Sequence, residues 1–473
     1  MRPDNLYFGG GVAETILSPF VGLALLIAGW MICVAPRRRA LPAFLSAAVL
    51  IPTDQVLMLG SLHFPALRVI ATFGLVRALI SRIKNKEIAF SGGITKIDIA
   101  LVGSMLISAM NGTLLWSSAS ALIYQIGNLI TLLGLYIALR LLIRNEGDVE
   151  LAQKTFVIIA GVVAAIMTCE QITGHNPYAF LGGARASSYA TVAERDDQSR
   201  ALACFGHPIL AGTFGAIMLP IFVGLWWRGR AFRTYAILGT VSSVVIALAS
   251  GSSTPLMAVA AGILGLLLYP WRQWMRAIRW GIVIMVVCLH MVMKAPVWNL
   301  IARVDVIGGS SGEHRYQLVN QFILHFWDWW LIGTRSNADW GWGMWDTCNQ
   351  YVAVGEAAGL VPFVLLLMVI VYGFKFLGRA RKTPGISRKQ ALFLWSLSVG
   401  IFANVVAFFG ISYFDQTIVA WYGLLAVSIA MANAHQKKAV LLEGTNSKHT
   451  EESGILISNH PSWIHACGPS ITP

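Results

Sequence analysis

Charged residues are scarce in this chain of 473 residues, of which only 12% are Asp, Glu, Lys or Arg. Soluble domains carry about 25% charged residues, so the composition excludes an ordinary soluble protein. The apolar runs also lack the period-two alternation of barrel strands, which excludes a membrane β-barrel. Apolar runs of about 20 residues recur instead, and they predict an all-α fold, a polytopic membrane helix bundle.

Cysteines are few, and none of the six has the spacing of a metal ligand, so we expect no metal site. Cys204 and Cys348 would lie on the same membrane face. A disulfide between them is one alternative, and burial as free thiols is the favoured one. Met1–Phe8 lacks a basic segment followed directly by a short apolar core, so we expect no cleavable signal peptide.

The apolar runs predict about 13 transmembrane helices. Pro52 and Asp54 interrupt the second of these spans, which leaves a re-entrant segment as an alternative there. The predicted spans are Thr15–Ala35, Leu41–Gly60, Pro65–Ile80, Ile97–Trp116, Ala121–Leu142, Phe156–Ile172, His207–Trp227, Tyr235–Ala249, Pro255–Tyr269, Trp280–Lys294, Tyr351–Phe374, Leu392–Phe409 and Thr417–Ala432.

Basic residues are distributed unevenly between the loops and predict the orientation of the bundle. They gather in the loops that follow the odd-numbered spans, and they are missing from the turns Ser117–Ser120, Ser250–Thr254 and Gly410–Asp415. The positive-inside rule therefore predicts an external amino terminus and a cytoplasmic carboxyl terminus. The same rule accounts for the net charge of +13, so we expect no nucleic-acid partner.

This topology predicts one membrane domain over residues 1–434. Residues 435–473 form a polar cytoplasmic tail whose composition predicts disorder. Two long polar loops, 173–205 and 296–349, would both lie outside the membrane, the second between helices 10 and 11.

The loop 296–349 is rich in charged residues and tryptophan, unlike the apolar runs on either side. A connection of this length is too long to be only a linker. We interpret it as a folded loop that carries the chemistry, because loops on rigid scaffolds often hold sites. The alternative is a lid that packs on the membrane surface, where tryptophan is common.

Several arginines fall on the predicted outer face, where the positive-inside rule disfavours them. Arg200, Arg315 and Arg335 are three of these, and a guanidinium group fits phosphate in a bidentate way. The alternative is internal ion pairs with acidic residues of the same loops, and we favour phosphate binding for Arg200 and Arg315. His207 begins the seventh span, either as a site histidine or as an interfacial helix cap.

A family resemblance follows from the order of several motifs. Arg200–Pro220 (RALACFGHPILAGTFGAIMLP), the turn Ser250–Pro255 (SGSSTP), Glu313–Tyr316 (EHRY) and the stretch Asn349–Leu360 occur in this order on the predicted topology. In this respect the chain resembles the O-antigen ligase and O-antigen polymerase superfamily. The family pattern has a histidine directly before the asparagine, where this chain has Cys348.

The resemblance implies an enzyme of the bacterial inner membrane that needs no metal or other cofactor. It would move an undecaprenyl-diphosphate-linked oligosaccharide onto an acceptor glycan. Arg200 and Arg315 would hold the diphosphate, and the expected substrate site also includes His207, Arg335 and Asn349. The candidates for the general base are Asp346, Glu313 and His314.

Polymerase is favoured over ligase, because the histidine of the ligase-like pattern is absent. A chain-length regulator is a further candidate partner, besides the lipid bilayer. The rival class is a membrane transporter or flippase, in which Asp54 and Asp98 would be coupling sites. A transporter should concentrate its polar residues at the middle of the membrane, whereas here they gather in the outer loops. A structural partner of an export complex would leave the outer arginines unexplained.

Overall fold

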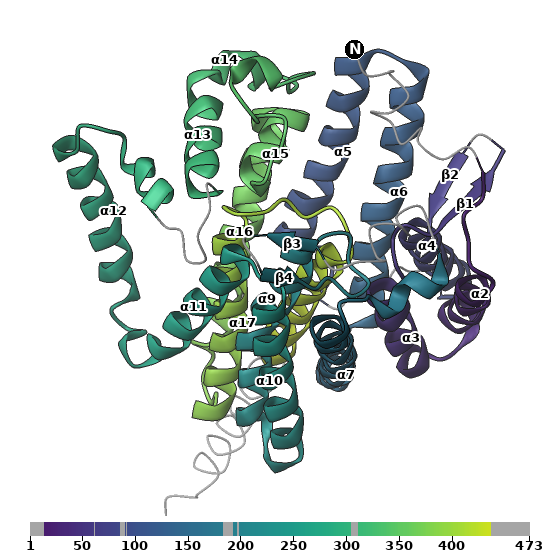
Figure 1. Ribbon diagram of the computed structural model, residues 1–473. Helices are drawn as coiled ribbons and strands as arrows, with labels where there is room; N and C mark the ends of the chain where they lie inside the picture. The colour runs from purple at the N-terminus through teal and green to yellow at the C-terminus, as the bar shows by residue number, and fades with distance from the viewer. Residues whose placement is uncertain are drawn as a thin grey trace, which may run out of the picture.

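A computed structural model of the protein describes residues 14–60, 62–85, 90, 92–182, 193–195, 198–303 and 311–436 (Figure 1). The described part of the chain is 77% helical, and its strands form two small hairpins, which confirms the predicted all-α class. The hairpins are β1 (Val56–Leu59) with β2 (Leu62–Pro65), and β3 (Ala193–Arg195) with β4 (Gln198–Arg200). Residues 437–473, most of the predicted tail, lie outside the described residues.

Nine helices of the described chain are long and apolar enough to cross a membrane, which confirms a multi-pass bundle. Some of the remaining predicted spans are helices that are shorter or more charged. The nine are α5 (Lys96–Trp116), α6 (Ala119–Leu142), α7 (Glu146–Thr173), α9 (Pro208–Leu225) with the 3₁₀ turn η2 (Trp226–Arg228), α10 (Arg233–Ala249) with η3 (Arg230–Phe232), α12 (Met275–Val292), α16 (Leu360–Ala380), α17 (Arg388–Ala407) and the helix Thr417–Gln436.

The remaining elements are shorter or connect these helices. The other helices are α2 (Pro19–Val34), α3 (Arg37–Leu50), α4 (Ala66–Asn85), α11 (Ser253–Leu267), α13 (Ser311–Leu324), α14 (Phe326–Trp329) and α15 (Gln350–Ala358). The other 3₁₀ turns are η1 (Pro177–Leu181), η4 (Tyr269–Trp271), η5 (Val297–Arg303) and η6 (Ala338–Trp340).

The predicted second span, Leu41–Gly60, is not one helix. α3 ends at Leu50, and the chain then forms β1, which pairs antiparallel with β2. Pro52 explains the end of α3, because proline lacks an N–H group and disfavours a helical conformation in the residue before it.

The predicted eleventh span, Tyr351–Phe374, is divided into α15 and α16. Gly359 separates them with a φ of +87°, and a Cβ atom there would lie 2.6 Å from the carbonyl oxygen of Leu331. Only glycine fits such a contact at a positive φ. α15 therefore belongs to the loop region, and the membrane span is α16.

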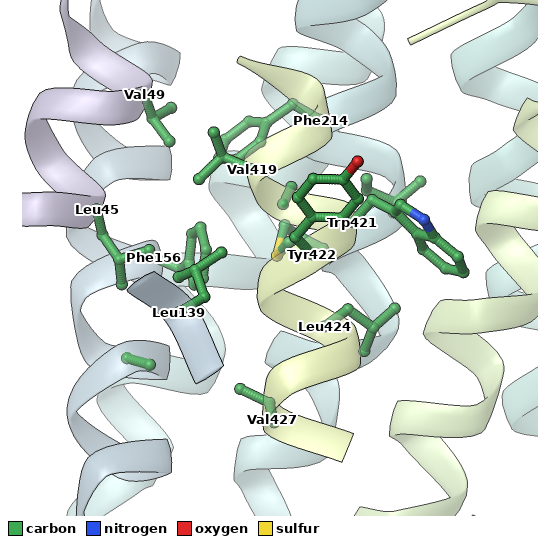
Figure 2. Packing of buried hydrophobic residues seen from close by; sticks show 14 of the residues in the cluster. Leu45, Val49, Leu139, Phe156, Phe214, Val419, Trp421, Tyr422, Leu424 and Val427 are labelled. Atoms are coloured by element: carbon green, nitrogen blue, oxygen red, sulfur yellow. The ribbon is translucent and has the colours of Figure 1, made fainter. Parts of the chain in front are cut away.

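The helix Thr417–Gln436 stands at the centre of the bundle. In its most apolar window 89% of the residues are buried, the largest share among the nine long helices of the described chain. Figure 2 shows Val419, Tyr422 and Leu424 of this helix among side chains from α3, α6, α7 and α9. Tyr422 also meets Tyr136 of α6 edge to face, with ring centroids 5.5 Å apart. This helix is the core against which the outer helices pack.

A buried ion pair fixes the start of α5 against the end of α6. The Nε atom of Arg140 donates to Oδ1 of Asp98 over 2.8 Å, and the hydroxyl of Tyr136 donates to the same oxygen over 2.6 Å. Asp98 and Thr95 also form a capping box at the start of α5. Arg140 is 0% exposed and Asp98 is 4% exposed, so this network is a closed structural unit.

α12 stands apart from the bundle at the left of Figure 1, and none of its residues is buried. η5 and α13 follow it in the chain and return to the bundle. α13, α14 and α15 lie together at the top of the view, on the side of the bundle that also carries the β3–β4 hairpin. We call this side the loop face.

Candidate functional site

The turn Ser250–Thr254, which leads from the end of α10 into the first two residues of α11, is the point where two predicted site arginines meet. Arg200 donates through Nη2 to the hydroxyl of Ser252 over 2.7 Å. Arg315 donates through Nη2 to the hydroxyl of Thr254 over 3.1 Å. The fold therefore brings together two arginines that are far apart in the sequence, and we call them and this turn the arginine site.

Hydrogen bonds to α7 and α10 hold Arg200 in place. The side-chain amide of Gln171, near the end of α7, donates to the carbonyl oxygens of Ser199 over 2.9 Å and Ala249 over 2.8 Å. The backbone N–H of Ala201 donates to Ala249 over 3.0 Å. The chain on both sides of Arg200 is thus tied to the end of α10, next to the turn.

A carboxylate fixes the next residues of the chain. Glu170 is 1% exposed and accepts hydrogen bonds from the backbone N–H groups of Leu202 (2.8 Å) and Ala203 (2.7 Å). Gly251 of the turn has a φ of +53°, and a Cβ atom there would lie 3.0 Å from Cγ of Arg200. The close approach of Arg200 to the turn therefore needs glycine at this position.

Arg315 lies on the buried face of α13. Leu318 and Phe322 follow it three and seven residues later, on the same helix face, and are also buried. They pack in an apolar cluster with Trp329, Trp340, Met344 and Val352. Arg315 itself is only 5% exposed, and Thr254, which accepts its hydrogen bond, donates in turn to the carbonyl oxygen of Gly410 over 3.2 Å.

Cys348 is close enough to Arg315 for the two groups to interact electrostatically. Burial raises the pKa of the Cys348 thiol to about 11, with Asp346 adding to the increase and Arg315 opposing it. The thiol is therefore protonated at neutral pH and is a poor base. Cys204 is also a free thiol, it donates to the carbonyl oxygen of Val49 over 3.1 Å, and burial raises its pKa as well.

The three predicted base candidates are divided between two places. His314 Nε2 lies 3.0 Å from the carbonyl oxygen of Asp346, so this nitrogen carries the hydrogen. The Asp346 side chain is exposed beside Cys348. Glu313 lies on the exposed side of α13 and accepts a hydrogen bond from Gln317 over 2.7 Å. Asp346 and His314 thus belong to the same part of the loop face.

Two predicted substrate-binding residues cap helices. His207 accepts the backbone N–H of Ile209 through Nδ1 over 3.2 Å at the start of α9. Asn349 is 1% exposed and accepts the N–H groups of Tyr351 (2.9 Å) and Val352 (3.2 Å) at the start of α15. This geometry favours the capping alternative for His207, and it gives Asn349 a structural role.

Arg335 contacts a different part of the molecule. Its Nε atom donates to the carbonyl oxygen of Leu115 over 2.8 Å, in the last turn of α5. The last carbonyl groups of a helix carry partial negative charge, which stabilises a cation there. The contact ties the loop that follows α14 to the end of α5, and it does not join Arg335 to the arginine site.

Glu356 is an acidic residue that sequence reasoning did not select as a site residue. It is 8% exposed, and it accepts hydrogen bonds of 3.0 Å from the amide of Asn337 and from the hydroxyl of Thr347. Burial raises the pKa of its carboxyl group to about 7, against the lowering by these two hydrogen bonds. Glu356 therefore fixes the segment that carries Asp346. In the sequence, this role of Glu356 was indicated by its position as a charged residue in an apolar stretch just before Gly359.

Searches of protein-family profiles and of curated protein sequences found no match for this chain. The functional interpretation therefore depends on the arginine site and its surroundings. These comprise two arginines on a short hydroxyl-bearing turn, with Cys348 near Arg315, Asp346 near Cys348, and His314 hydrogen-bonded to the backbone of Asp346.

Proposed function

We propose that the protein is a glycan transferase that moves an undecaprenyl-diphosphate-linked oligosaccharide onto an acceptor glycan, as a polymerase. The observation that carries the proposal is the convergence of Arg200 and Arg315 on the Ser250–Thr254 turn. Each guanidinium can bind one phosphate through two parallel hydrogen bonds. Two guanidinium groups on one short turn match the two phosphates of a diphosphate.

The proposed reaction gives the two arginines a direct role. An acceptor hydroxyl oxygen attacks the anomeric carbon of the donor, and the bond from that carbon to the diphosphate oxygen breaks. Negative charge then builds on the leaving diphosphate, where Arg200 and Arg315 stabilise it. Asp346 takes the proton of the acceptor hydroxyl. The residues named here carry out this transfer without a metal ion.

Exposed tryptophans of the loop face supply a surface for the acceptor. Trp342 is 99% exposed and Trp345 is 69% exposed, and both precede Asp346 closely in the chain. Trp327 is 76% exposed on α14. Exposed indole rings stack on the apolar faces of sugar rings, so these residues would guide an acceptor toward Asp346.

The proposed location is the bacterial inner membrane, with the loop face outside. Arg37, Arg82 and Lys389 belong to the basic loops of the opposite face, whereas the turn of the arginine site has no basic residue of its own. This charge distribution supports an external amino terminus and a cytoplasmic carboxyl terminus. A lipid-linked donor would then present its diphosphate at the level of the arginine site.

A ligase is the second candidate, and Cys348 at the position of the family histidine counts against it. A transporter or flippase would use Asp98 as a coupling residue. The buried network of Asp98 with Arg140 and Tyr136 supports a structural role for this carboxylate instead.

The test is a transfer assay with purified protein and lipid-linked oligosaccharide. We expect Arg200→Ala and Arg315→Ala each to lower the rate about a hundredfold or more, because each removes a charge that stabilises the leaving group. Arg276→Ala removes an exposed cation from α12 and should leave the rate unchanged. Rates equal to wild type in both arginine-site variants would overturn the proposal.

A further inference from the structure

A second basic site lies at the face opposite the loop face. A hollow of about 320 Å³ is lined by Trp226, Trp227, Gly229, Arg230, Arg233 and Lys389. These residues come from η2, η3, the start of α10 and the first turn of α17. The hollow is therefore enclosed by helix ends that are distant in the sequence.

Three cations line this hollow, and no carboxylate does. Arg230, Arg233 and Lys389 are exposed, and none of the three forms an ion pair with any residue that the structure describes. Their neighbour Arg228 differs, because it forms a 2.6 Å ion pair with Glu150. The charge of Arg228 is thus neutralised by Glu150, whereas the three cations that line the hollow have no ion-pair partner among the described residues.

Local contacts hold the lining side chains. The guanidinium carbon of Arg233 lies 5.0 Å from the ring centroid of Trp226, a distance at which cation and indole attract each other. A capping box between Ser387 and Gln390 begins α17 and sets Lys389 in its first turn. The cations are therefore supplied by defined helix ends rather than by a loose loop.

We infer that this hollow binds the phosphate of an anionic phospholipid headgroup. Three cations supply the charge that a phosphate requires, and basic pockets between membrane helices at the cytoplasmic side suit anionic headgroups. Trp226 and Trp227 favour a lipid over a soluble phosphate, because indole rings concentrate at the depth of the headgroups.

The position of the hollow gives such a lipid a defined effect. α10 begins at Arg233 and ends at Ala249, directly before the turn of the arginine site. A headgroup that bridges Arg233 and Lys389 would join the starts of α10 and α17. The site itself depends only on the lining residues, and so it does not rest on the proposed glycan transfer.

The test is native mass spectrometry of the full chain in detergent, with phosphatidylglycerol or phosphatidylcholine added in steps. The wild type should retain phosphatidylglycerol in preference to phosphatidylcholine. The variant Arg230→Ala/Arg233→Ala/Lys389→Ala should bind phosphatidylglycerol about a hundredfold more weakly, because three headgroup contacts are lost. The control variant Arg38→Ala/Arg39→Ala/Arg276→Ala loses the same charge from exposed positions elsewhere and should bind as the wild type does.

Three results would overturn the inference. These are equal retention of the two lipids, equal losses in the two triple variants, and displacement of phosphatidylglycerol by an equal concentration of inorganic phosphate. The last result would assign the hollow to a soluble phosphate. If the triple variant does not fold, Lys389→Gln replaces it, since this side chain is exposed and should weaken binding about fivefold. Unchanged binding in Lys389→Gln would then contradict the inference.

Discussion

Two buried arginines of this protein have different surroundings, and each calls for a different test. Arg140 is 0% exposed and donates to the carboxylate of Asp98 over 2.8 Å within the helix bundle. Arg315 is 5% exposed and donates to the hydroxyl of Thr254 over 3.1 Å at the loop face. The Asp98 carboxylate cancels the charge of the Arg140 guanidinium group.

The neighbours of the two arginines differ in the same way. The Asp98 carboxylate is shared with Tyr136 and with the capping box of α5, so its oxygens are committed to the fold. Arg315 shares its turn with Arg200, and both Arg315 and Asp346 interact electrostatically with Cys348. The first arrangement closes a helix junction, and the second is the arrangement on which the proposed glycan transfer is based.

The largest effect should come from breaking the Asp98–Arg140 pair. Asp98→Ala leaves a buried cation without its carboxylate, so we expect the protein to lose about 3–5 kcal/mol of stability. Thermal unfolding in detergent measures this. Arg315→Ala should change the unfolding temperature much less, because it removes a buried charge rather than leaving one behind.

A double variant checks the cause of that loss. Asp98→Leu/Arg140→Met removes both charges and keeps apolar volume, so it should recover most of the stability. An equally unstable double variant would mean that packing, and not the unpaired charge, causes the loss. Equal destabilisation by Asp98→Ala and Arg315→Ala would show that the two arginines do not differ in their contribution to stability.

The next effect concerns Glu356, whose pKa burial raises from about 4.5 to about 7. The folded state therefore holds this proton more tightly than the unfolded state. The protonated Glu356 carboxyl group therefore stabilises the folded state relative to the ionised one. This contribution is fully present below pH 4.5 and is lost as the pH rises through 7. We expect the wild type to lose about 3 kcal/mol between these limits, and Glu356→Gln to lose much less. Unfolding temperatures measured at acid and at mildly alkaline pH test this, and identical pH dependence in both proteins would contradict it.

A smaller effect should follow from Asp346, as the proposed general base. Asp346→Asn cannot accept a proton and should lower transfer about a hundredfold while donor binding is retained. Cys348→Ser should be nearly silent, because burial keeps the thiol protonated. The assay is transfer with purified protein. Full activity in Asp346→Asn would move the role to His314 or Glu313, and an inactive Cys348→Ser would move it to the cysteine.

The sequence predicted the parts of the fold that depend on local composition. Long apolar runs became helices because only helical backbone satisfies its own hydrogen bonds in lipid. The predicted spans at Leu41–Gly60 and Tyr351–Phe374 were wrong in their extent. Pro52 and Gly359 end helices inside these apolar stretches, and hydropathy averaged over a window does not detect such breaks.

The candidate site was predictable from the sequence only where it depends on local sequence. The helix caps at His207 and Asn349 follow from local sequence, since each directly precedes a helix. The contact of Arg335 with Leu115 and the raised pKa of Glu356 depend on tertiary packing between distant segments. The arginine site also forms through tertiary packing. The predicted outer-face position of its arginines and the order of the motifs indicated these residues, but not the contacts that join them.

The most direct test of the account measures how tightly the protein binds polyprenyl diphosphate and polyprenyl monophosphate. The account predicts that the wild type prefers the diphosphate about a hundredfold, with each arginine holding one phosphate. Arg200→Ala and Arg315→Ala should each abolish this preference, and lysine at either position should restore only part of it, because a point charge lacks the bidentate fork. Undiminished preference for the diphosphate in the variant Arg200→Ala/Arg315→Ala would contradict the account.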